Sequence, residues 1–169
     1  MNILITVASR HGSTREIAEM LAQGLRAADH CVDVRNIEEG PSIAMYDAVI
    51  IGSAIYMGKW LPSAAQFVED NRVRLGEVPV WLFSSGPLGR EDPQPTGDPK
   101  QIDTLMAVTR AREHRVFVGK LDKHSLGVGE RLIARAVGAP EGDFRDWAAI
   151  RSWAHEITGV LRTHPTFGA

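Results

Sequence analysis

The stretch Ile3-Leu4-Ile5-Thr6-Val7-Ala8-Ser9-Arg10-His11-Gly12-Ser13-Thr14 opens the chain and decides its fold. Its first five residues are apolar or β-branched, a composition typical of a buried strand. Small and hydroxyl-bearing residues follow, and apolar residues then recur at helical spacing from Arg15 to Leu25. The pattern therefore predicts a strand, a short turn and a helix.

This turn is a candidate anion site. The N-terminus of a helix leaves backbone N–H groups unpaired and carries the positive end of the helix dipole. Gly12 lets an anion approach the backbone, and the hydroxyls of Ser9, Ser13 and Thr14 can donate further hydrogen bonds. A second interpretation stays open, in which Ser13 or Thr14 simply caps the helix. The turn has neither the lysine of a nucleoside-triphosphate loop nor the G-x-G-x-x-G pattern.

Strands alternate with helices along the rest of the chain. The patterns predict strands at 31–35, 46–53, 78–85 and 115–121, and helices at 62–71, 100–112, 130–137 and 147–161. The runs 46–53 and 78–85 are almost wholly apolar and end in small residues, as strands buried on both faces of a parallel sheet do. We therefore expect an α/β protein with a doubly wound parallel sheet.

Three loops are expected to meet at one edge of this sheet. Right-handed crossovers place the carboxyl ends of parallel strands together, where ligands bind at a switch in strand order. The loops that leave those ends are residues 9–14, 53–60 and 85–90. The second loop carries Tyr56, Met57 and Trp60, which are large flat or polarizable side chains. A phosphate site at the first loop and aromatic side chains at the second would suit a nucleotide with a large planar ring.

Composition limits the class of protein. The 169 residues predict one domain, here 1–162, followed by a flexible tail at 163–169. A net charge of −2 gives no basic footprint for nucleic acid. The single cysteine, Cys31, precludes an internal disulfide and is expected to be a packed core thiol. No histidine spacing suits a metal, and no signal-like or membrane-length apolar run is present, so a cytoplasmic protein is expected.

The chain resembles the flavodoxin family over essentially its full length. The resemblance is carried by Ser9–Thr14, by Gly52–Gly58, by Ser84–Gly89 and by the helix that follows Trp60. Residues 117–122 and 146–157 are similar to the branch that contains menaquinone-dependent protoporphyrinogen oxidase. The resemblance implies a flavodoxin-like, doubly wound, five-stranded parallel sheet of order 2-1-3-4-5 with helices on both faces.

The resemblance also implies FMN, bound without covalent attachment at the three loops. The first loop would hold the phosphate, the second would line the isoalloxazine ring with Tyr56 or Trp60 stacked on it, and the third would touch another edge of the ring. The cofactor-binding residues expected on this basis are Ser9, Arg10, His11, Gly12, Ser13, Thr14, Ser53, Ala54, Ile55, Tyr56, Met57, Gly58, Trp60, Ser85, Gly86, Pro87, Leu88 and Gly89. No catalytic side chain and no metal ligand is assigned.

Three functions remain open at this point. The first is an FMN-dependent oxidoreductase acting on a small molecule or quinone, protoporphyrinogen among them. The second is an electron carrier between redox proteins, which in this family tends to surround the flavin with acidic residues. Here Lys59 lies in the second loop and Arg90 offsets Glu91 and Asp92 beside the third, which favours the enzyme. The third is a flavin-free domain that kept the fold. A homo-oligomer is compatible with each.

Overall fold

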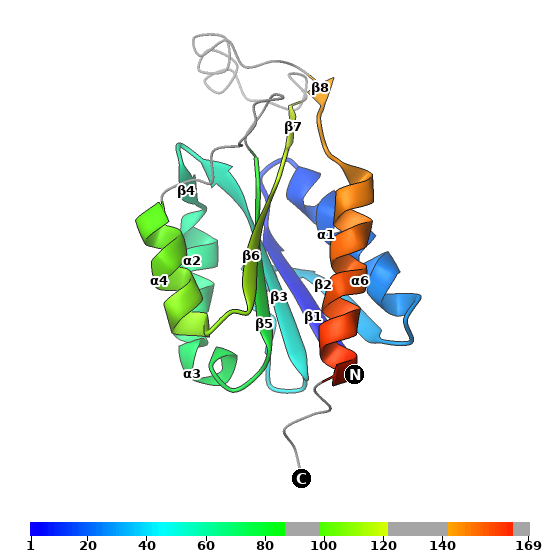
Figure 1. The fold of residues 1–169 in the computed structure, drawn as a ribbon. Helices are drawn as coiled ribbons and strands as arrows, with labels where there is room; N and C mark the ends of the chain where they lie inside the picture. Colours follow the sequence, from blue (N-terminus) through cyan, green and yellow to red (C-terminus); the bar gives the residue numbers. More distant parts are fainter. Residues whose placement is uncertain (87–98, 122–141, 164–169) are drawn as a thin grey trace.

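The structure is a computed structural model that describes residues 1–86, 99–121 and 142–163 (Figure 1). Its first half contains β1 (Asn2–Ala8), α1 (Ser13–Arg26), β2 (Cys31–Asn36), the 3-10 helix η1 (Ile37–Glu39), β3 (Ala48–Tyr56), β4 (Lys59–Trp60), α2 (Pro62–Asp70) and α3 (Arg72–Leu75). The second half contains β5 (Val80–Ser85), α4 (Pro99–Thr109), β6 (Glu113–Phe117), β7 (Lys120–Leu121), β8 (Gly142–Asp143) and α6 (Trp147–Thr163).

The main sheet is built on parallel strands in the order β2-β1-β3-β5-β6. In the register of the three strands at one side, Ile3 of β1 pairs with Val32 of β2 and Ala48 of β3. The short β4 adds to the end of β3 as an antiparallel partner. The short β4 is not among the five predicted strands. When those five alone are numbered along the chain, the observed order is 2-1-3-4-5, so the predicted sheet and its topology are confirmed.

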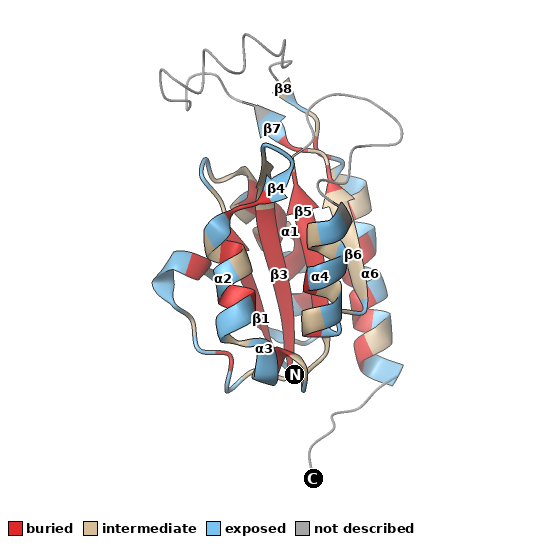
Figure 2. Ribbon diagram, turned by 90° about the vertical axis from the view of Figure 1, so that its left-hand side faces the viewer, coloured by how far each residue is buried: buried red, intermediate tan, exposed pale blue. Residues whose placement is uncertain are grey.

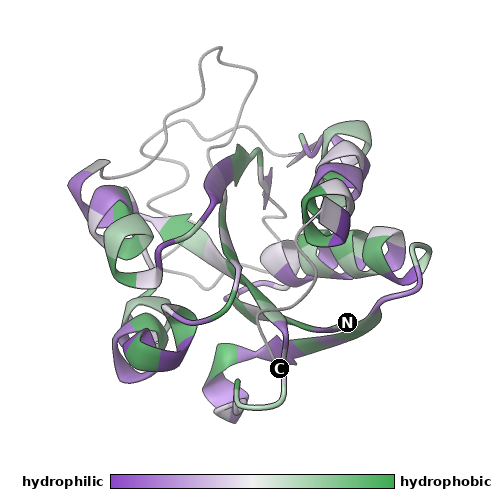
Figure 3. Cartoon of the chain, turned by 60° about the horizontal axis from the view of Figure 1, so that its bottom comes forward, coloured by the Kyte–Doolittle hydropathy of each residue, from purple (hydrophilic) through white to green (hydrophobic). Residues whose placement is uncertain are grey.

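Helices cover both faces of the sheet, α1 and α6 on one side and α2 and α4 on the other (Figures 1 and 3). The central strands are buried almost throughout (Figure 2). The core beneath α1 and α6 includes Trp81, Phe83 and Trp153, each at most 2% exposed. The last helix buries one apolar face in this core, formed by Ile150, Trp153, Ala154, Ile157 and Leu161.

The structure corrects the prediction for Cys31, which is exposed. Cys31 is the first residue of β2, and β2 lies at the edge of the sheet. Only one face of such an edge strand packs on the core, and Val32 occupies that face. The alternation of the strand therefore turns the thiol toward solvent.

Several predicted boundaries also differ from the structure. The segment expected to be a loop after residue 53 continues β3 to Tyr56 and returns as β4. The strand expected at 115–121 ends at Phe117, and Lys120–Leu121 pairs with β8 instead. The last helix extends to Thr163. The helix predicted at 130–137 lies outside the described residues, as do residues 164–169 of the predicted tail. In the part of the chain that is described, no helix is long and apolar enough to cross a membrane.

Candidate functional site

The N-terminus of α1 has no side-chain cap. Gly12 is the N-cap residue, with φ 80° and ψ −14°, and no side-chain hydrogen bond closes this end of the helix. The interpretation of Ser13 or Thr14 as a capping residue is therefore wrong. A Cβ placed on Gly12 would have no atom of the described residues within 4 Å, so this part of the chain leaves its backbone open to an approaching ligand. The first N–H groups of α1 are left as donors for an anion.

Two hydroxyl groups beside this helix end are buried and lack a hydrogen-bond partner among the described residues. They are Ser9 Oγ and Thr14 Oγ1, and Thr14 is 0% exposed. Buried hydroxyl groups are nearly always paired, because leaving one unpaired costs about 1–3 kcal/mol. A phosphate bound here would supply acceptor oxygens to both hydroxyls and to the backbone donors. The residues of the first loop therefore fit the phosphate of FMN.

The second loop is a tight β-hairpin. Tyr56 pairs with Lys59, and Met57 and Gly58 form the two-residue connection. Both have positive φ, 50° for Met57 and 78° for Gly58, which is the signature of a type I′ turn. A methionine rarely adopts this conformation, which suggests that the turn is held by its flanking strands. The side chain of Met57 is 88% exposed at the tip.

The three loops meet in space, as the topology predicts. The guanidinium of Arg10 in the first loop lies 4.4 Å from the centre of the Tyr56 ring in the second. In the third loop, Gly86 has φ 132°, and a Cβ there would lie 3.4 Å from the carbonyl oxygen of Ile55 in the second loop. Gly86 thus allows loops two and three to approach closely. Pro87, Leu88 and Gly89 lie outside the described residues.

Trp60, the last residue of the second loop, is buried, with 3% of its surface exposed. Its Nε1–H donates to Ser84 Oγ at 2.7 Å, and Ser84 Oγ is 2.7 Å from Nε2 of His114. Because an indole can only donate, Ser84 accepts from Trp60 and can donate its own hydrogen to a neutral His114. A second hydroxyl, Ser53 Oγ, accepts from the N–H of Leu61 at 3.0 Å. These bonds attach the hairpin to the sheet. The spacing of residues in the sequence does not reveal them.

Acidification is expected to destabilise the fold through His114. Burial lowers the pKa of this half-buried imidazole from 6.5, and the charge of Glu113 opposes that shift in part. The unfolded chain therefore binds the proton at a higher pH than the folded one, so stability is complete above about pH 6.5 and falls below it. Urea unfolding at about pH 7.5 and about pH 5.5 measures the loss.

The variant His114→Gln keeps an acceptor for Ser84 and removes the titrating group. We expect it to lose less stability between the two pH values than the wild type does. The exposed His155 supplies a control for the exchange of histidine for glutamine, and His155→Gln should show a larger loss than His114→Gln does. Equal losses in the wild type and His114→Gln would contradict the role of this imidazole.

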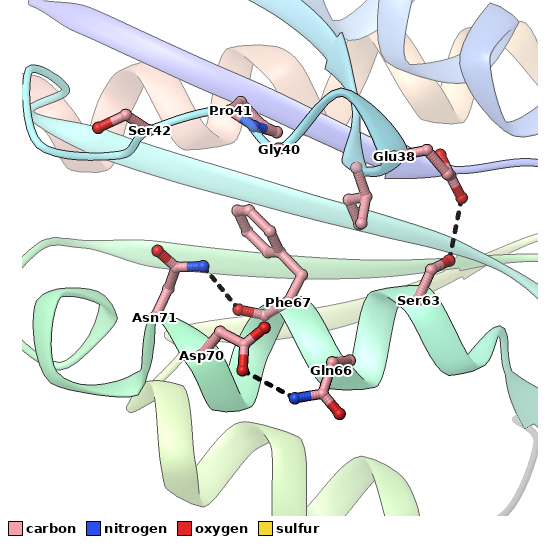
Figure 4. A pocket seen from close by; sticks show the side chains of 10 residues that line it. Glu38, Gly40, Pro41, Ser42, Ser63, Gln66, Phe67, Asp70 and Asn71 are labelled. Carbon is pink, nitrogen blue, oxygen red and sulfur yellow. Dashed lines mark hydrogen bonds between the residues drawn. The ribbon is translucent and has the colours of Figure 1, made fainter.

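A separate pocket of about 410 Å³ lies between α2 and the segment that follows η1 (Figure 4). Its polar side chains bond to one another or to the backbone: Ser63 donates to Glu38 at 3.0 Å, and Gln66 donates to Asp70 at 2.7 Å. Asn71 donates to the carbonyl of Phe67. Since these groups already have partners, the pocket lacks the unsatisfied donors found at the first loop.

A doubly wound parallel sheet with three convergent loops at its carboxyl edge defines an α/β protein of the flavodoxin-like class. The model of the flavodoxin domain matches residues 4–147 of the chain. Protoporphyrinogen IX dehydrogenase (quinone) of Escherichia coli K12 is 34% identical over 171 aligned positions, which cover 93% of this chain and 94% of that protein. The protein of the same name from Escherichia coli O157:H7 matches equally. The chain therefore belongs to the flavodoxin-domain family.

Solved structures agree on the fold. A flavodoxin from the domain Archaea superposes with a TM-score of 0.65 at 15% identity, covering 96% of this chain and 99% of that one. Rubredoxin oxygen:oxidoreductase of Desulfovibrio gigas has the same TM-score at 16% identity, with 96% of this chain and 36% of that one covered. At such identities the likeness concerns the fold alone. The predicted flavodoxin-like fold class is confirmed.

Proposed function

We propose that this protein is an oxidoreductase that binds FMN without covalent attachment. The phosphate is held at the N-terminus of α1 by the backbone N–H groups there and by the hydroxyls of Ser9, Ser13 and Thr14, with Arg10 and His11 beside it. The observation that carries the proposal is made among the described residues: the helix end has no side-chain cap, and two buried hydroxyls next to it have no hydrogen-bond partner. Such a constellation is costly in the ligand-free fold and is compensated by an anion.

In this proposal the isoalloxazine ring lies between the second and third loops, residues 53–60 and 85–90. Tyr56 is partly exposed, whereas Trp60 is buried and bonded to Ser84. We therefore assign ring contact to Tyr56 and assign Trp60 the role of fixing the hairpin. The peptide of Met57 and Gly58 forms the tip of this hairpin, where it can meet the ring edge. When bound, FMN supplies the electron transfer, and the protein orients it and limits access.

The substrate class proposed here is a partly apolar organic donor that carries negative charge, with a quinone as electron acceptor. The two relatives above are named for protoporphyrinogen IX and quinone. The first two loops contain Arg10 and Lys59 and no acidic residue, and Met57 exposes an apolar side chain at their rim. A basic and partly apolar rim of this kind suits an anionic tetrapyrrole. A basic partner protein would instead be attracted by acidic residues around the flavin.

The first test is the visible absorption spectrum of the purified protein before and after addition of FMN and desalting. Flavin bands that survive desalting support the cofactor assignment. A protein that stays colourless and retains no FMN contradicts it. Turnover of protoporphyrinogen that depends on an added quinone then supports the enzyme. Electron exchange with a reductase in a single turnover, without turnover of organic donors, favours a carrier instead.

The hairpin tip gives a prediction about redox potential. Gly58 has φ 78°, and a Cβ there would meet no atom within 4 Å, so Gly58→Ala strains only the backbone. We expect a stability loss of about 1 kcal/mol and a shift in the midpoint potentials of bound FMN, because the Met57–Gly58 peptide can no longer reorient freely. Potentiometry with absorption detection measures the shift.

Gly58→Asn is the matched control, since asparagine tolerates positive φ better than alanine does. Its potentials should lie between those of the wild type and of Gly58→Ala. Wild-type potentials in Gly58→Ala would rule out a role for this peptide in tuning the flavin.

A further inference from the structure

Arg145 is a buried cation that lies outside the three loops and contacts the helix end assigned to phosphate. It follows β8, and its side chain is 2% exposed. Its guanidinium bonds to the carboxylate of Asp143 at 2.6 and 2.8 Å and to that of Glu16 at 2.7 Å. It also donates to the carbonyl of Ser13 at 3.4 Å and lies 4.3 Å from the centre of the Trp147 ring.

These contacts join β8 to the first turn of α1. Ser13 is the first residue of the helix, and its neighbour Thr14 carries one of the two buried hydroxyls for which the described residues offer no hydrogen-bond partner. A planar guanidinium that bonds to three groups at once holds them in a fixed geometry. Arg145 therefore fixes the orientation of the first turn, on which the direction of its N–H groups depends.

The charges at this helix end make the same residue electrostatically important. Glu16 is the acidic residue of the first turn of α1. An acid there stabilises the helix, but it repels a phosphate dianion at the same end. Arg145 forms an ion pair with Glu16 from the side of β8, and Lys120 lies 4.0 Å from Glu16. Asp143 is the second carboxylate bound by Arg145. Hydrogen bonds from Arg145 are the main cause of the lowered pKa of Asp143.

We infer that Arg145 is a positioning residue for phosphate: it orients the first turn of α1 and neutralises Glu16, so that this helix end accepts a dianion. The inference rests on the proposed FMN site and deepens it. It assigns part of the affinity for the phosphate to a side chain that does not line the phosphate loop.

The test compares FMN with riboflavin, which has the same ring system but no phosphate. Dissociation constants are measured by quenching of flavin fluorescence for the wild type, Arg145→Met and Arg145→Lys. We expect Arg145→Met to weaken FMN binding about tenfold or more and to change riboflavin binding less than about threefold, because the carboxylates of Glu16 and Asp143 then lose the guanidinium between them and repel the phosphate, which riboflavin lacks. Arg145→Lys should lose less, since it keeps the charge without the planar fork.

Removal of the repelling charge separates electrostatics from folding. In Arg145→Met, the additional change Glu16→Gln should restore the part of the FMN affinity that is lost through repulsion by Glu16, without changing the affinity for riboflavin. Glu16→Gln alone leaves Arg145 with Asp143 and should strengthen FMN binding relative to riboflavin. This single variant keeps the test decisive if Arg145→Met fails to fold.

An unchanged ratio of FMN to riboflavin affinity in Arg145→Met, or in Glu16→Gln, overturns the inference while leaving the FMN site intact. A wild-type protein that binds neither flavin overturns the proposed function itself. A wild type that prefers FMN, together with a selective loss of FMN affinity in Arg145→Met, supports both.

Discussion

Replacement of Thr14 by valine is expected to weaken FMN binding about tenfold to a hundredfold and to stabilise the ligand-free protein at the same time. A hydrogen bond to a charged group contributes about 1.5–3 kcal/mol, and about 1.4 kcal/mol corresponds to a tenfold change in Kd. Valine has nearly the same shape as threonine and lacks the hydroxyl. Since Thr14 Oγ1 is buried and has no hydrogen-bond partner in the described part of the chain, its removal relieves an unpaired polar group. Fluorescence titration and urea unfolding measure the two effects.

Thr6 provides a matched control within the same chain. It is 0% exposed in β1, and its Oγ1 also lacks a partner among the described residues. Thr6→Val should therefore stabilise the protein to a similar extent without changing FMN affinity. Ser9→Ala should behave like Thr14→Val. If Thr14→Val binds FMN as tightly as Thr6→Val does, the Thr14 hydroxyl is not a phosphate ligand.

The fold was predictable because local signals and long-range topology agree in this chain. Apolar β-branched runs such as Ile3–Val7 are separated by segments of helical spacing, and that alternation admits few arrangements other than a parallel sheet. The loops of the site follow from the same topology, since the strand ends share one edge. Arg10 near Tyr56 and Gly86 near Ile55 confirm that the loops converge.

The details that the sequence did not reveal depend on tertiary contacts. The hairpin turn contains Met57 at positive φ, where the common Asn-Gly or Asp-Gly signal is missing. Trp60 is buried because Ser84, 24 residues away, accepts its N–H. Arg145 and the first turn of α1 are 132 residues apart, and no periodicity connects them. The lack of partners at Ser9 and Thr14 is likewise a property of the folded chain.

Gly52→Ala is expected to have the largest effect on stability, a loss of about 3 kcal/mol or more. Gly52 lies in the centre of the sheet beside Phe83 on the neighbouring strand. A Cβ at Gly52 would lie 2.1 Å from the tip of the Phe83 ring. Phe83 is 0% exposed and packs edge-on against Phe117 and Trp153, so its ring has no space into which to move. Thermal unfolding should show a Tm lower by roughly 10 °C.

Gly159 in α6 is the matched control, because a Cβ there would meet no atom within 4 Å. Gly159→Ala should stabilise the protein by about 0.5–1 kcal/mol through helix propensity. Phe83→Leu creates room at the ring tip, so in that background Gly52→Ala should cost much less than it does alone. Such coupling would show that the ring of Phe83 fills the space above Gly52. Additive losses, or a wild-type Tm in Gly52→Ala, would instead mean that the sheet can shift to admit the methyl group.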